Sequence, residues 1–172
     1  IPSRVSVVAS DGRAYAPDSA WMHADDGFDR ALQSSETRYF HCAPPCLLEL
    51  PPGKVEVTVQ HGFAHAIWQG AAAVSEGKMT RQQVQLTARA LPEKFGQWIS
   101  ADLHVHMNYG GHYRNTPTNR ARQARAEDLD LVYDLIVNKE QRIPDIGYFR
   151  TDADPASNRF VTIMHGQEFH TS

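Results

Sequence analysis

The chain has 172 residues, of which 41% are hydrophobic and 22% charged, and its formal net charge is −3 with neutral histidines. This composition is ordinary for a globular protein and allows one medium or two small domains. It offers neither the basic balance that binds nucleic acid nor an apolar run long enough to span a membrane, so we expect neither as a partner.

Residues 1–92 are predicted to form a small β-sandwich. Apolar and polar residues alternate at 5–10, before the turn residues Asp11-Gly12, and most clearly at 54–60. Further short strands are predicted at 37–41, 47–50 and 83–89. Several short strands with turn residues between them are typical of a sandwich.

Two pairs of residues in this part have chemical potential. Cys42 and Cys46 flank Ala-Pro-Pro, and a disulfide there would suit an oxidising compartment, which predicts a secreted or periplasmic protein. Two unpaired, buried cysteines are an equal alternative. His61 and His65 follow the strand at 54–60, but no acidic residue is near them in sequence, so we expect them in a surface loop.

A proline and a glycine frame residues 92–98, where the alternation stops, and this predicts a second domain over 93–172. Its first strand is expected at 101–105. A helix over 118–127 follows, with Thr116 as N-cap and Pro117 at the first helical position. The apolar run at 129–137 predicts a strand of a parallel sheet, covered on both faces.

The ends of two expected strands carry metal-binding side chains. His104 and His106 are two residues apart, so both imidazoles project from one face of the strand. Gly110-Gly111 allows a turn that would bring His112 back to the same place. The run at 160–164 ends in a similar way, since His165, Glu168 and His170 follow it. Imidazole and carboxylate are ligands for zinc, manganese and iron.

These residues resemble the start of a PHP domain, the polymerase and histidinol phosphatase superfamily of metallohydrolases. Asp102-Leu-His-Val-His106, Gly110-Gly-His112 and His165-Gly-Gln-Glu168 carry the resemblance, which covers residues 98–172, and residues 135–145 look closest to the carbaryl-hydrolase-like branch. It implies the first part of an α/β (βα) barrel of PHP type holding two or three metal ions. The implied ligands are His104, His106, His112 and a bridging Glu168.

The residues before the second domain are similar, more loosely, to transthyretin-like or carboxypeptidase-regulatory-like sandwiches. Within the PHP resemblance, residues 136–139 stand where many members have Thr-Asp-His, and the family's later ligands have no counterpart. We therefore expect a chain that is truncated after its third barrel strand, either processed or part of something longer. Such a chain would be inactive without the rest of its own barrel or another chain that completes it.

The resulting hypothesis is a fragment of a metal-dependent hydrolase. Zinc, manganese or iron at Glu168, His104 and His106 would activate a water against an ester, amide, carbamate or phosphoester bond of a small molecule. Five residues are expected to orient the ligands or contact the substrate: Asp102, Asn138, Lys139, His165 and His170. The alternative is a non-catalytic binding or structural β-sandwich module with a degenerate barrel remnant.

Overall fold

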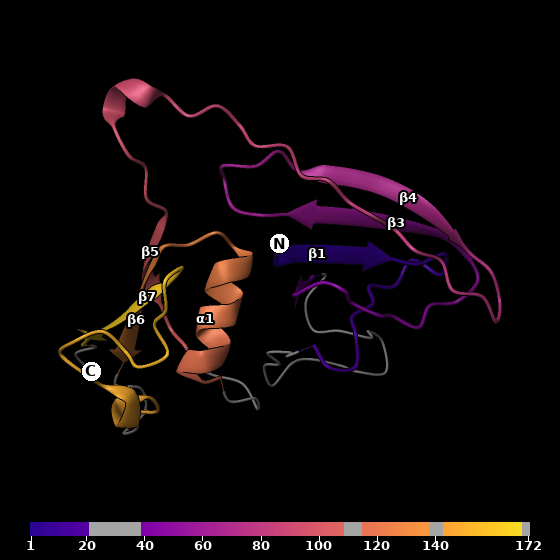
Figure 1. Ribbon diagram of the computed structural model, residues 1–172. Helices are drawn as coiled ribbons and strands as arrows, with labels where there is room; N and C mark the ends of the chain where they lie inside the picture. The colour runs from indigo at the N-terminus through magenta and orange to yellow at the C-terminus, as the bar shows by residue number, and fades with distance from the viewer. Residues whose placement is uncertain (21–38, 109–114, 138–142, 170–172) are drawn as a thin grey trace.

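A computed structural model describes residues 1–20, 39–108, 115–137 and 143–169 of the chain (Figure 1). Within these residues lie seven β-strands, one α-helix and two 3-10 helices, η1 (Glu93–Phe95) and η2 (Ile146–Tyr148). The strands form a four-stranded antiparallel sheet and a three-stranded parallel sheet. No helix in the described part is long and apolar enough to cross a membrane.

The antiparallel sheet has the strand order β2-β1-β3-β4. Its bounds are β1 (Ser3–Val8), β2 (Phe40–Cys42), β3 (Gly53–Gln60) and β4 (Trp68–Val74). The alternation at 54–60 is confirmed as a strand, which pairs with β1 on one side and β4 on the other. Its buried face contributes to a core of Val7, Phe40, Cys42 and Val55.

The expected β-sandwich is wrong. Residues 47–50 and 83–89 form no strand, although Ala88 makes an isolated bridge to His65. Leu48 and Leu50 instead pack against the core of the antiparallel sheet without pairing to a strand. The described residues therefore contain one antiparallel sheet before residue 92, with no second sheet packed upon it.

The parallel sheet has the order β5-β6-β7, with bounds β5 (Ala101–Val105), β6 (Leu131–Val137) and β7 (Thr162–Glu168). Helix α1 (Pro117–Ala126) connects the first two strands, and Thr116 is its N-cap, as predicted. The helix contributes Ala121 and Ala124 to a core that it shares with Val132 and Ile163 of the sheet and with Val161, which directly precedes β7.

The expected first part of an α/β (βα) barrel of PHP type is also wrong. Only one α-helix is present in the described residues, and the described part of the connection from β6 to β7 contains just the short η2. The sheet is covered less than expected, because four of the five residues of β5 are exposed and Leu103 is 61% accessible. A three-stranded open sheet beside an antiparallel sheet is the observed architecture.

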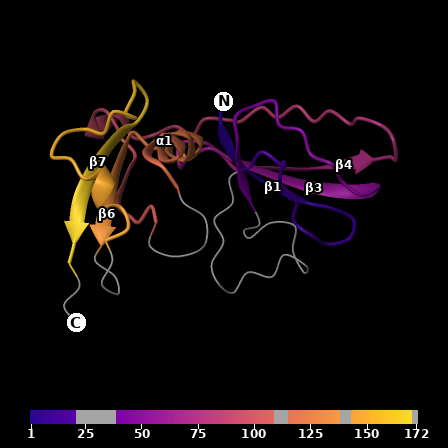
Figure 2. The same cartoon turned by 90° about the horizontal axis from the view of Figure 1, so that it is seen from below.

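Helix α1 lies between the two sheets, as the two views of the ribbon show (Figure 1 and Figure 2). Arg4 of β1 and His41 of β2 both bind the carboxylate of Glu127, which caps the C-terminal end of α1. The predicted domain boundary at residues 92–93 falls in the long connection from β4 to β5, and it stays a prediction.

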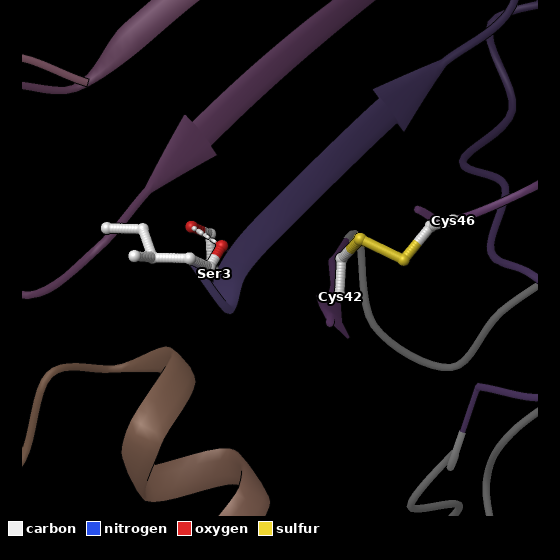
Figure 3. Close-up of a disulfide and its surroundings, with 4 residues drawn as sticks. Ser3, Cys42 and Cys46 are labelled. Carbon is white, nitrogen blue, oxygen red and sulfur yellow. Dashed lines mark hydrogen bonds between the residues drawn. A yellow bond between two sulfur atoms is a disulfide. The ribbon is translucent and has the colours of Figure 1, made fainter. Parts of the chain in front are cut away.

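A disulfide joins Cys42, at the end of β2, to Cys46 (Figure 3). Of the two alternatives that the sequence left open, the bonded form is therefore the observed one, and the described residues contain no free cysteine. The bond closes the loop around Pro44 and Pro45 at the edge of the sheet, where Cys42 is opposite Ser3 of β1.

Candidate metal centre

Three side chains converge at one end of the parallel sheet, and we call His104, His106 and Glu168 the strand-end group. Glu168 Oε2 is 2.8 Å from His104 Nε2 and 2.9 Å from His106 Nε2. The two Nε2 atoms are 3.2 Å apart. The three atoms are thus close enough together to bind a single ion.

The topology explains this convergence. His104 belongs to β5, His106 follows it directly, and Glu168 is the last residue of β7. Parallel strands all end at the same edge of a sheet, which is where α/β proteins bind their ligands. Strand β6 lies between β5 and β7, and its last residue, Val137, is in register with Glu168. The carboxylate therefore has to reach across β6 to meet the imidazoles.

A hydrogen bond fixes the orientation of His106. Its Nδ1 is 2.9 Å from the carbonyl oxygen of Leu135 in β6. A carbonyl oxygen only accepts, so Nδ1 carries a proton, and in the neutral imidazole Nε2 then holds the electron pair on the side of Glu168. Metal-binding histidines are commonly held by such a bond from their other ring nitrogen.

The donor set fits a divalent transition metal. In a tetrahedral centre with bonds of about 2.0–2.1 Å, the ligand atoms lie about 3.4 Å apart. The observed separations of 2.8–3.2 Å need only a small expansion to reach that value. Two imidazoles and one carboxylate leave further coordination positions open, and His104, whose side chain is 64% exposed, leaves room for water.

A cavity of about 650 Å³ lies beside this group, where α1 and both sheets meet, and His106, Asp102 and Arg120 line it. Burial lowers the pKa of Arg120, and the negative charges of Asp134, Asp102 and Asp145 offset part of this lowering. Its guanidinium remains a cation at neutral pH, and its buried Nε has no hydrogen-bond partner among the described residues.

The other predicted site residues lie apart from the strand-end group or outside the described residues. Asp102 Oδ1 accepts the backbone N–H of His104 at 3.1 Å, and so supports β5 at the point where its register shifts. His112, Asn138, Lys139 and His170 fall outside the described residues, so the structure does not place them.

His165 is inaccessible to a substrate, because its side chain is fully buried between two carboxylates. Its Nε2 is 2.9 Å from Asp154 Oδ2, and its Nδ1 is 3.3 Å from Asp134 Oδ2. Burial raises the pKa of Asp134, as does the charge of Asp145, while Arg120 and His165 oppose the rise. His165 and Asp134 are paired in register on the neighbouring strands β7 and β6.

Sequence reasoning missed a second group of metal-binding side chains. The ligand atoms of His61, His65 and Asp128, which we call the junction group, lie within 4.8 Å of one another. The expectation of surface-loop histidines is wrong for His61, which is only 8% exposed. Its acidic companion follows α1, far along the chain, so no local sequence pattern could have indicated the group.

No protein-family model, curated protein or solved structure matches this chain. The resemblance to the PHP superfamily therefore stays a prediction. Any function has to be argued from the arrangement of the residues themselves.

Proposed function

We propose that the strand-end group binds a divalent transition metal (zinc, manganese or iron) and that the chain belongs to a metal-dependent hydrolase. The observation that carries the proposal is the convergence of His104 Nε2, His106 Nε2 and Glu168 Oε2 within 3.2 Å of one another. The motif resemblance to PHP metallohydrolases points in the same direction.

The alternative is that the three side chains form a hydrogen-bonded cluster in a non-catalytic binding or structural protein. The orientation of His106 favours the metal. Its Nδ1–H bond to Leu135 holds the ring so that Nε2, the ring nitrogen that a metal ion would bind, lies 2.9 Å from the carboxylate.

An ion bound there would supply a water whose pKa is lowered from 15.7 to about 7, and would polarise a carbonyl or phosphoryl oxygen. The cavity beside His106 has the volume of a small-molecule site, for which about 300–1,000 Å³ is typical. Arg120 lines it and brings a positive charge to its wall. The substrate that this arrangement favours is a small ester, amide, carbamate or phosphoester with a polar or anionic end.

The proposal extends to the compartment. The Cys42–Cys46 disulfide forms and persists under oxidising conditions, so it supports a secreted or periplasmic protein. An extracellular or periplasmic site would also expose the strand-end group to the metal ions of that environment.

The test is a titration of the metal-free chain with Zn²⁺, Mn²⁺ and Fe²⁺, read by calorimetry and by metal analysis after dialysis. Glu168→Gln keeps the size of the side chain and removes its charge, and we expect it to weaken binding at this site by about tenfold or more. His104→Ala should have a similar effect. Gln167→Ala, at the exposed neighbouring position of β7, is the matched control and should bind as the wild type does.

Less than about half an equivalent of metal per wild-type chain would contradict the proposal. So would equal affinities of the wild type and Glu168→Gln for all three ions.

A further inference from the structure

We infer that the junction group is a second metal site, which binds a divalent transition metal and thereby joins the two halves of the molecule. The inference does not depend on the proposed hydrolase, because it uses a different set of residues. His61 and His65 follow β3 of the antiparallel sheet, whereas Asp128 lies between α1 and β6. An ion there would link segments that are distant in sequence.

Both histidines are held to the backbone through Nδ1, and His61 is oriented as a ligand. His61 Nδ1 is 3.2 Å from the carbonyl oxygen of Ala126, and His65 Nδ1 is 3.0 Å from that of His61. Because carbonyl oxygens accept, each Nδ1 carries a proton, and in a neutral ring Nε2 then holds the electron pair. Bonds of this kind from the distal ring nitrogen are the usual support of metal-binding histidines. The Nε2 of His61 faces Asp128, whereas at His65 it is Nδ1 that lies 3.7 Å from Asp128 Oδ2, so an ion would need the His65 ring to turn.

Asp128 supplies the carboxylate, and its Oδ1 is 3.2 Å from His61 Nε2. It is the single non-glycine residue with positive φ (57°) in the described part of the chain. The conformation turns its side chain toward the histidines. Gly62, also at positive φ, allows this approach, because a Cβ at that position would collide with the Asp128 side chain.

The charges around the junction group favour the binding of a cation. Ala126, whose carbonyl oxygen accepts from His61, is the last residue of α1, and the C-terminal end of a helix carries partial negative charge. Glu127 adds another carboxylate next to Asp128 in sequence, although Arg4 and His41 already neutralise it. Among the described residues no arginine pairs with Asp128, and its carboxylate oxygens lie 3.2 Å from His61 Nε2 and 3.7 Å from His65 Nδ1.

The group also has the composition of a site with an open position. Two imidazoles and one carboxylate are the ligand types of three-ligand zinc sites, in which water takes the fourth place. His61 is buried, but His65 lines the cavity that His106 also reaches. Water therefore has access to the junction group from the cavity.

The competing arrangement is a protonated His61 in an ion pair with Asp128, without a metal. The experiment that separates the two uses the full chain with His104→Ala and His106→Ala, which removes the strand-end group. We expect this metal-free protein to bind about one equivalent of Zn²⁺, and Co²⁺ to give the visible absorption of a nitrogen- and oxygen-ligated ion.

Asp128→Asn in that background should weaken Zn²⁺ binding by about tenfold or more. Asparagine adopts positive φ readily, so this variant removes the charge without straining the turn. Asp130→Asn is the matched control, because it makes the same change of charge two residues away, where the carboxylate instead accepts the Ser100 N–H at 2.8 Å. His61→Gln with His65→Gln should abolish binding.

Two results would overturn the inference. One is the absence of Zn²⁺ binding by the protein that lacks the strand-end group while its circular dichroism matches that of the wild type. The other is equal Zn²⁺ affinity in the Asp128→Asn and Asp130→Asn variants.

Discussion

At the level of single residues, the bond made by a histidine's Nδ1 fixes the orientation of the ring and, in a neutral imidazole, leaves the electron pair on Nε2. His106 and His61 both donate from Nδ1 to a backbone carbonyl, and both turn Nε2 toward a carboxylate. The spacing of His104 and His106 revealed their shared face in advance, because a strand alternates with a fixed period. The partner of His61 could not be found in this way, since only the folded chain brings Asp128 to it.

Glu127 gives the clearest residue-level prediction of pH dependence. Burial raises the pKa of its carboxyl group, but the hydrogen bonds and charges of His41 and Arg4 outweigh burial, so the pKa lies below its usual value of 4.5. A lowered pKa in the folded state means that the stabilisation is present above pH 4.5 and is lost as the pH falls through the folded-state pKa.

Glu127→Gln should therefore lower the free energy of unfolding at pH 7 by about 1–2 kcal/mol, a value reduced for the partial exposure of Arg4. The difference from the wild type should shrink below about pH 4.5, as the wild-type carboxylate is protonated. Urea denaturation of both proteins at several pH values measures this difference in the free energy of unfolding. Glu56→Gln breaks an exposed pair with Lys54 and is the control for surface charge. A difference in the free energy of unfolding that stays constant down to acid pH would contradict the stabilising role of the Glu127 carboxylate.

At the level of elements, the sequence predicted those whose signals are local. The alternation of β3 and the Thr116-Pro117 start of α1 belong to this class. Strand β4 was missed because alanine and glycine, which have low strand propensity, make up most of its interior. It forms because its backbone pairs with β3 along seven residues. Residues 83–89 show the converse, since they alternate well but pair only through Ala88.

The N-cap of α1 can be tested as an element. Thr116 accepts the Asn119 N–H at 3.3 Å, and Thr116→Ala should cost about 0.5–1 kcal/mol of stability in urea denaturation. Thr116→Ser keeps the hydroxyl group and should retain nearly all of the wild-type stability. Because α1 carries Ala121 and Ala124 into the core of the parallel sheet, the loss should appear in global unfolding. Equal stabilities of the alanine and serine variants would show that the hydroxyl does not cap the helix.

At the level of the whole molecule, the predicted fold was wrong in both halves of the chain. Patterns of alternation indicate which face of a strand is buried, but not what covers it. A second sheet was therefore inferred over the antiparallel sheet, whereas the first part of a barrel was implied by the resemblance to the PHP family. The structure has two separate cores, one for each sheet. They meet at the end of α1 through polar contacts of Glu127 and Asp128.

If these contacts couple the two cores, their loss should let the sheets open separately. In the wild type we expect the slowest amide protons of β3 and β6 to exchange with similar opening free energies, as in one cooperative unit. In the double variant Glu127→Gln/Asp128→Asn, native-state hydrogen exchange should show two different values, with the less stable sheet opening alone. The matched control Lys54→Gln/Glu56→Gln removes an ion pair from the exposed face of β3, where both side chains are more than two-thirds accessible, and should leave the two values together. Coincident exchange in the junction variant would mean that apolar packing around α1, and not this pair of carboxylates, makes the molecule cooperative.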